Sequence, residues 1–178
     1  MSHIGKKIIE IPIDVAVKII DNNIIIEGKY GILKQPLFDV LSISILNNQI
    51  KIIPNNNLKS TRAFFGLLRT LINNMIIGVT KRFTKTLIME GVGYKFQYTN
   101  SILYIFTGFT NSINILIPDD ILINVDSATK ISLSGINKEK VGFFASKIYN
   151  VKPPEPYKGK GILYEHQQIK RKIGKKGK

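Results

Sequence analysis

The chain has 178 residues and a formal net charge of +14, from 26 lysines and arginines against 12 aspartates and glutamates. An apolar content of 44% is enough to bury a core, which excludes a disordered polycation. The absence of cysteine excludes disulfides and thiolate metal sites. A basic folded chain of this length is expected to form one large or two small domains and to bind nucleic acid, with an anionic membrane as the weaker alternative.

The N-terminal start has neither the continuous apolar region of a secretory signal nor the composition of a transit peptide. No apolar run reaches the roughly 20 residues that span a bilayer. We therefore expect no membrane attachment, and a protein that is made where it works or whose presequence is already missing.

The first half of the chain predicts short antiparallel strands followed by a long helix. Strand-like runs at 22–28, 42–46 and 50–54 are separated by Asn-Asn, Gly or Pro. The helix is expected from Leu58 to Ile77, with Ser60 or Asn57 as its cap and Gly78 just past its end. Apolar residues at helical spacing predict its buried stripe, which consists of Phe64, Leu67, Leu68, Leu71 and Met75.

Two arginines of this helix, Arg62 and Arg69, lie seven residues apart and share a face away from the apolar stripe. A solvated face is the ordinary role of such a pair, and contact with phosphate is the alternative in a strongly basic protein. Both interpretations stay open at this point.

The second half begins with Gly91-Val92-Gly93-Tyr94-Lys95, which lacks the third glycine and the helix of a dinucleotide site. We expect a bulge or a close backbone approach there, with RNA contact through Lys95 as the alternative. Asp119-Asp120 is expected to be a solvated turn. With two histidines in the whole sequence and no catalytic constellation, we expect no metal, no cofactor, no small-molecule substrate and no enzymatic activity.

The chain repeats its own pattern at an offset of about 80 residues. The segment 22–28 is similar to 100–108, the strand pairs near 42–54 are similar to those at 122–134, and each copy is followed by a helix, the second at Lys138–Tyr149. The apolar stripe expected for that helix consists of Val141, Phe144, Ala145 and Ile148. The predicted fold is α+β, with two tandem copies of a small antiparallel or mixed sheet covered by one helix. The expected divisions are 1–82, 83–151 and a loop with a basic extended tail at 152–178.

The C-terminal part concentrates the charge. Residues 152–178 hold nine basic and two acidic side chains. The segment from Pro153 to Gly161 combines three prolines, two glycines that flank Lys160, and the ring of Tyr157. A stiff loop followed by a mobile cationic tail from Lys170 suits a polyanion surface better than a small-molecule pocket.

Several motifs of the chain resemble those of a known family, large-subunit ribosomal protein six of the bacterial and organellar type, over essentially the whole length. The matching segments are Ser2–Lys6 with Pro12, Thr61-Arg62-Ala63, Asn74-Met75, Gly78-Val79-Thr80, Phe83 with Lys85, Gly91–Tyr94, Gly108-Phe109 and Lys152–Ile162. The last is the most specific. Arg82 departs from the usual glycine before Phe83, and Lys152 takes the position of an arginine.

The resemblance implies a structural protein of the large ribosomal subunit that binds its rRNA near the sarcin–ricin loop and the stalk base. Neighbouring ribosomal proteins would be its partners, with transient proximity to translational GTPases. Taking the residues and the resemblance together, the candidate rRNA contacts are Lys152, Pro153, Pro154, Tyr157, Lys158, Gly159, Lys160, Gly161, Tyr164, Lys170, Arg171, Lys172, Lys175, Lys176, Tyr94, Lys95, Arg62 and Arg69.

The alternative function is a free nucleic-acid-binding module, such as a nucleoid or RNA-assembly factor. Heavy use of Ile, Asn and Lys, whose codons are AT-rich, indicates a biased genome. We therefore expect the ribosome of an organelle, with the mitochondrial matrix favoured and the plastid stroma or an AT-rich bacterial cytoplasm as alternatives.

Overall fold

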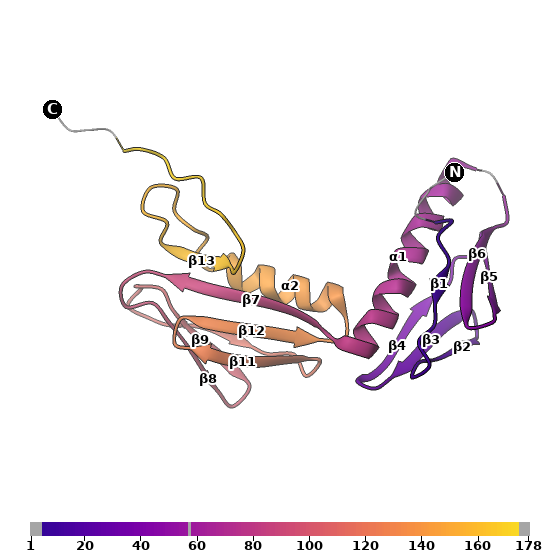
Figure 1. Ribbon diagram of the computed structural model, residues 1–178. Helices are drawn as coiled ribbons and strands as arrows, with labels where there is room; N and C mark the ends of the chain where they lie inside the picture. Colours follow the sequence, from indigo (N-terminus) through magenta and orange to yellow (C-terminus); the bar gives the residue numbers. More distant parts are fainter. Residues whose placement is uncertain (1–4, 57, 175–178) are drawn as a thin grey trace. The chain divides into compact units, whose positions relative to one another are not determined.

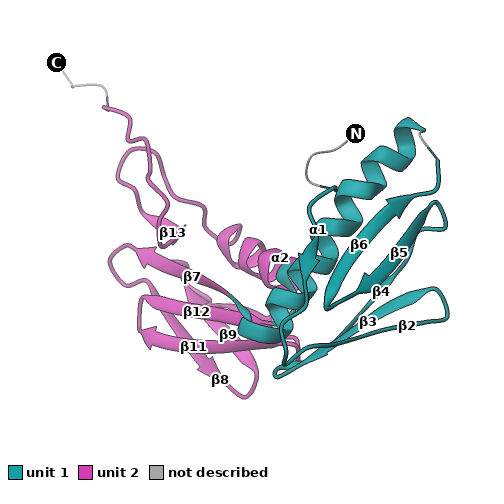
Figure 2. Ribbon diagram, turned by 45° about the vertical axis from the view of Figure 1, so that its right-hand side comes forward, with its two compact units in different colours: residues 1–83, 136–138 teal, residues 84–135, 139–178 magenta. Residues whose placement is uncertain are grey.

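The computed structural model describes residues 5–56 and 58–174. The chain divides into two compact units (Figure 2). Unit 1 runs to Phe83 and includes Ile136–Lys138, whereas unit 2 comprises Thr84–Gly135 and the residues from Glu139 onward. Each unit is described by itself below.

Unit 1 has two small antiparallel sheets and one helix, α1 (Figure 1). One sheet has the strand order β2-β3-β4 and the other β1-β6-β5. The elements are β1 (Ile9–Glu10), β2 (Ala16–Ile20), β3 (Asn23–Gly28), β4 (Gly31–Pro36), β5 (Leu41–Leu46), β6 (Gln49–Pro54) and α1 (Lys59–Lys81).

The core of unit 1 lies between α1 and the inward faces of these sheets. Ile24 and Ile26 alternate with less buried neighbours along β3, and Ile50 does the same in β6. They join Leu68 and Ile72 of α1 in one buried cluster. Burial of each such side chain stabilises the folded state by about 1.5–3 kcal/mol, so α1 is held mainly by its packing.

The buried stripe of α1 differs from the predicted one. Of the five predicted residues, Leu68 and Met75 are buried, but Phe64 and Leu67 are 37% and 47% exposed. The buried positions are Thr61, Phe65, Leu68, Ile72, Met75, Ile76, Gly78 and Val79. The helix is apolar over more than one face, so the sheets decide which face is buried.

Both ends of α1 also differ from the prediction. The helix continues through Gly78 to Lys81, and the N–H of Arg82 donates to the Gly78 carbonyl at 3.0 Å. At the other end Leu58 is the cap residue, and Ser60 lies inside the helix. The amide oxygen of Asn56 accepts hydrogen bonds from the Leu58 N–H and the Thr61 hydroxyl. The other predicted cap, at position 57, lies outside the described residues.

Among the described helices, α1 alone has the length and apolar composition that would allow a membrane span. Its 23 residues are packed by their buried stripe into the core of unit 1. The length and composition of α1 are therefore explained by its place as a core helix.

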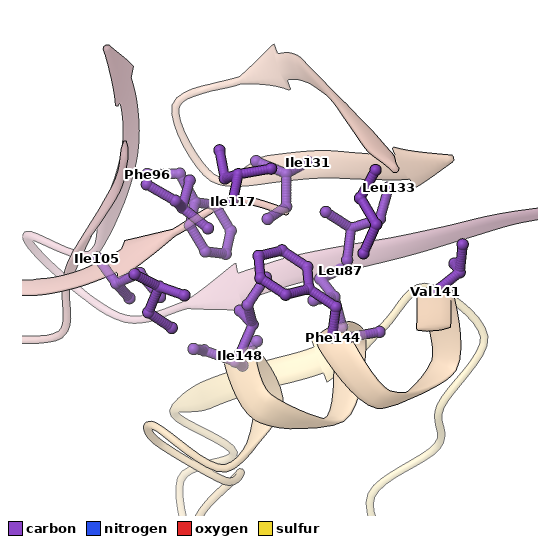
Figure 3. Close-up of a cluster of buried hydrophobic side chains, with 14 of the residues drawn as sticks. Leu87, Phe96, Ile105, Ile117, Ile131, Leu133, Val141, Phe144 and Ile148 are labelled. Carbon is purple, nitrogen blue, oxygen red and sulfur yellow. The ribbon is translucent and has the colours of Figure 1, made fainter. Parts of the chain in front are cut away.

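Unit 2 repeats this plan, with sheets of order β10-β9-β8 and β11-β12-β7-β13. Its helix, α2, buries Val141, Phe144, Ala145 and Ile148, as the sequence predicts. Figure 3 shows three of these side chains directed toward residues of the strands, among them Leu87 and Leu133. The elements are β7 (Phe83–Glu90), β8 (Lys95–Thr99), β9 (Ile102–Phe106), β10 (Ile113–Leu116), β11 (Ile121–Ser127), β12 (Lys130–Gly135), α2 (Lys138–Tyr149) and β13 (Gly161–Tyr164).

The strand orders confirm the predicted α+β fold and its duplication. The order β1-β6-β5 in unit 1 matches β7-β12-β11 in unit 2, and β2-β3-β4 matches β8-β9-β10. Asp21-Asn22 and Asn100-Ser101 close equivalent hairpins with positive φ at both central residues, the geometry of a type I′ turn. In unit 2 the segment expected to form a separate loop and tail adds β13 to the free edge of β7.

Candidate nucleic-acid interface

The strand β13 fixes the segment that carries the prolines and lysines. It pairs antiparallel with β7, with Gly161 opposite Glu90 and Tyr164 opposite Leu87. Ile162 is fully buried in the core of unit 2. The loop between α2 and β13 is therefore anchored at both ends by packed elements.

Backbone hydrogen bonds close the loop on itself. The N–H of Ile162 donates to the Lys152 carbonyl at 2.8 Å, and the N–H of Glu155 donates to the Lys160 carbonyl at 2.8 Å. A third bond joins the Gly159 N–H to the Glu155 carbonyl at 2.9 Å. Because the loop's prolines also fix φ, the predicted stiff loop has a physical basis in this structure.

Most of the predicted side chains of the loop face solvent. Lys158, Lys160 and Pro153 are exposed, and the ring of Tyr157 is 53% exposed. Gly159 is buried beneath the guanidinium of Arg171, which lies 3.0 Å from the position that a Cβ of Gly159 would take. The loop therefore presents two cations and an aromatic ring on an ordered backbone.

The first residues of the basic tail lie along this loop, whereas the sequence predicted a mobile tail from Lys170. The N–H of Lys172 donates to the Pro156 carbonyl at 2.8 Å. Arg171 forms an ion pair with Glu90 at 3.8 Å. Lys170 and Lys172 are exposed beside the loop, whereas Lys175 and Lys176 lie outside the described residues. The described part of the tail thus extends the cationic surface of the loop.

An ion pair fastens the start of the tail to the sheet of unit 2. The Lys130 ammonium lies 2.6 Å from the Glu165 carboxylate, and the Glu165 N–H donates to the Thr86 carbonyl at 3.1 Å. The hydrogen bond from Lys130 lowers the pKa of Glu165 below its ordinary 4.5, and the same bond raises the pKa of Lys130 above 10.5. Because the pair is exposed, it contributes little to the free energy of unfolding, and its effect is to hold this segment against the sheet locally.

The lowered pKa of Glu165 sets the direction of a pH effect. Its contribution is complete above the unfolded pKa near 4.5 and is lost as the pH falls through the lower folded pKa. We expect the Glu165 amide to become less protected from hydrogen exchange across that acid range, relative to the core amide of Leu133. Glu165→Gln should remove this step, whereas the control Glu155→Gln should keep it. An unchanged acid profile in Glu165→Gln would contradict the assigned role of the pair.

A second group of predicted residues lies at the β7–β8 turn. The Tyr94 N–H donates to the Gly91 carbonyl at 3.3 Å, and the Tyr94 ring packs against Gly91 and Gly108. Gly91 and Gly93 have φ of 155° and 77°, and the predicted close approach occurs at Gly91, where a Cβ would lie 2.9 Å from the Tyr94 ring. Lys95 places its ammonium 4.8 Å from the centroid of the Phe106 ring.

Three predicted residues have other surroundings. Tyr164 stacks on Tyr149 with ring centroids 5.3 Å apart, and burial raises its pKa, so its ring serves packing within unit 2. Arg62 and Arg69 belong to unit 1, whereas the loop and the start of the tail belong to unit 2. The Arg69 Nε also donates to the Lys7 carbonyl at 3.4 Å.

Sequence reasoning did not select Phe109, Lys130 or Glu165. Phe109 follows Gly108, is 54% exposed, and has the Lys152 ammonium 4.8 Å from its ring centroid. The motif Gly108-Phe109 was a possible signal, but it contributed only to the family resemblance. The ion pair between Lys130 and Glu165 joins residues 35 positions apart, so no local sequence pattern predicts it.

Within residues 5–56 and 58–174, no group of three or more His, Cys, Asp or Glu side chains is placed to hold a metal ion. Asp119-Asp120 forms the turn between β10 and β11, where Asp120 pairs with Lys140. This pairing gives Asp120 a structural role in unit 2.

The fold and this surface define a class of protein: a duplicated α+β chain whose second copy carries an ordered, basic, proline- and glycine-rich loop. Comparison with known proteins gives the particular family. A family model described as "Ribosomal protein L6" matches residues 11–82 and 90–165. The chain therefore belongs to the ribosomal protein L6 family, a family of structural ribosomal proteins and not of enzymes, as the sequence motifs predict.

Curated relatives match over nearly their whole length. "Large ribosomal subunit protein uL6" of Dictyoglomus thermophilum is 43% identical over 100% of this chain and 99% of its own. The protein of that name from Borreliella burgdorferi is 42% identical over 99% and 98%. The one from Geobacter sulfurreducens is 43% identical over 100% and 99%.

Proposed function

We propose that this chain is a structural constituent of the large ribosomal subunit and that it binds large-subunit rRNA through the closed loop and tail of unit 2. Family membership supports the ribosomal assignment. The observation that carries the rRNA contact is the ordered loop that exposes Lys158 and Lys160 beside Lys170 and Lys172. Cations carried on an ordered backbone contact a phosphate backbone at a lower entropic cost than cations on a flexible segment, and the shape of the RNA would supply the specificity.

We further propose a position near the sarcin–ricin loop and the stalk base, with neighbouring ribosomal proteins as partners and translational GTPases passing close by. This position rests on the family resemblance. The relatives named above are bacterial, so they support a ribosomal location and give no support to a mitochondrial one. We propose an organellar origin on the heavy use of Ile, Asn and Lys, whose codons are AT-rich, with an AT-rich bacterial cytoplasm as the alternative.

Neutralising two exposed lysines of the loop tests the rRNA contact. We expect Lys158→Gln with Lys160→Gln to weaken binding to deproteinised large-subunit rRNA by about a hundredfold or more, because hydrogen bonds to charged groups contribute about 1.5–3 kcal/mol each. The slope of log affinity against log salt should also fall by roughly one for each phosphate that the variant no longer neutralises. Filter binding at several salt concentrations measures both quantities.

The matched control replaces two exposed lysines of unit 1, Lys18 and Lys34, by glutamine. It removes the same charge and should leave the affinity close to that of the wild type. Equal losses in both double variants would reduce the effect to net charge and contradict the loop as the contact. A wild-type protein that fails to sediment with large subunits in moderate salt would favour the free nucleic-acid-binding module instead.

A further inference from the structure

We propose that unit 2 carries a stacking site for one unpaired RNA base, formed by the ring of Phe109 with Lys152 beside it. This inference rests on the proposed rRNA binding and adds the chemical class of the group that is recognised. It also adds Phe109, which the loop and tail do not include.

Phe109 is an exposed aromatic ring that follows a strand with a buried face. The ring is 54% exposed, although the core of unit 2 buries the alternate side chains Leu103 and Ile105 of the preceding strand β9. It follows Gly108, whose φ of 77° turns the chain away from the strand direction. An exposed aromatic ring on an ordered turn gives a flat face on which a base can stack.

Two residues from other segments of unit 2 contact this turn. The Tyr94 ring packs against Gly108, where a Cβ would lie 3.2 Å from Tyr94 Cε1. The Lys152 ammonium lies 4.8 Å from the centre of the Phe109 ring, and the Lys152 carbonyl is part of the hydrogen-bonded loop. The backbone that carries Phe109 is therefore held in place before any ligand binds, which lowers the entropic cost of stacking.

The local charge favours a nucleotide. The segments 91–95 and 106–112 contain one lysine and no acidic residue. Lys152 places a second cation over one face of the ring, which leaves the other face for a base and adds a positive charge near the phosphates of a stacked nucleotide. A base inside a duplex has both faces covered by its neighbours, so the group that stacks on Phe109 is an unpaired base.

The sequence contains no tryptophan, so Phe109→Trp introduces a single fluorescent reporter at the site. On titration with deproteinised large-subunit rRNA, we expect its emission to be quenched at saturation. Phe143→Trp is the matched control, because Phe143 is also an exposed aromatic of unit 2, at 76%, but lies on α2. Its emission should change little. Phe109→Leu, which keeps an apolar side chain and loses the ring, should weaken binding by about 5- to 150-fold.

The outcomes separate this inference from the proposed function. Salt-dependent rRNA binding with unchanged Phe109→Trp emission would overturn the stacking site and leave the rRNA contact in place. Equal quenching of both tryptophans, or equal quenching of Phe109→Trp by a fully paired RNA duplex, would also overturn it. Failure of the wild-type protein to bind the rRNA would remove both proposals.

Discussion

Replacing Gly78 by alanine is expected to destabilise unit 1 by about 3 kcal/mol or more, since overpacking against atoms that cannot move aside is among the most damaging changes to a core. A Cβ at this position in α1 would overlap the carbonyl oxygen of Ile136 and lie 3.2 Å from the Phe83 ring. The overlap is with backbone, so a change of side-chain rotamer cannot relieve it. The helix would have to shift away from residues that it buries.

The control for this prediction is the same substitution in the other helix, Gly142→Ala. No atom lies within 4 Å of the position that its Cβ would take, so the change should stabilise α2 by about 0.5–1 kcal/mol through helix propensity. Urea unfolding followed by circular dichroism at a helix-sensitive wavelength measures the stability change of both variants. Each helix contributes to this signal, since α1 has 23 residues and α2 has 12. Similar small effects of the two variants would contradict the close approach at Gly78.

Gly78 also shows why the sequence predicted the existence of α1 but not its end or its orientation. A glycine after an apolar periodic segment indicates either a helix end or a close approach by another segment. At Gly78 the reason is a close approach by the backbone of Ile136, which is 58 residues away in the sequence. The buried face was ambiguous for a related reason: Phe64-Phe65 and Leu67-Leu68 are adjacent apolar pairs, so two neighbouring stripes fit the same period.

The helix of unit 2 was predictable because its pattern admits one buried face. Val141, Phe144 and Ile148 are spaced three and four residues apart, so they lie on one face of the helix. Phe143 is the one phenylalanine of α2 outside this buried stripe. The duplication was equally accessible, because its hairpins close with residues that tolerate positive φ and recur at a fixed offset.

The candidate interface was predictable in composition but not in its anchoring. Prolines, glycines and lysines act locally, so the sequence indicates a stiff cationic loop. The pairing of β13 with β7 and the contact between Arg171 and Glu90 join residues about 70–80 positions apart, and no short pattern encodes them. The surroundings of Phe109 are equally non-local, because Tyr94 contacts Gly108 and Lys152 contacts the Phe109 ring from different parts of unit 2.

Gly161→Ala is expected to detach the loop from the rest of unit 2. It should lower both the affinity for rRNA and the stability of unit 2. Gly161 has φ of 145°, and its Cβ would lie 2.7 Å from Pro154 Cα and 2.9 Å from the Lys152 carbonyl oxygen. Strain at such a φ costs about 1–3 kcal/mol, and the backbone overlap adds a similar amount, so a loss of about 3 kcal/mol or more is expected. Tyrosine fluorescence reports this loss during urea unfolding, because unit 2 contains six of the seven tyrosines.

The control Gly93→Ala separates strain from the anchoring of the loop. Gly93 also has a positive φ, 77°, but no atom lies within 4 Å of its Cβ position, so it should cost about 1–2 kcal/mol and leave the loop in place. If the loop binds rRNA as an ordered surface, Gly161→Ala weakens binding at least as much as the loss of Lys158 and Lys160, although every lysine is still present. Full affinity in a Gly161→Ala protein with a detached loop would show that charge alone suffices. The order that β13 imposes would then serve the fold of unit 2 rather than its contact with RNA.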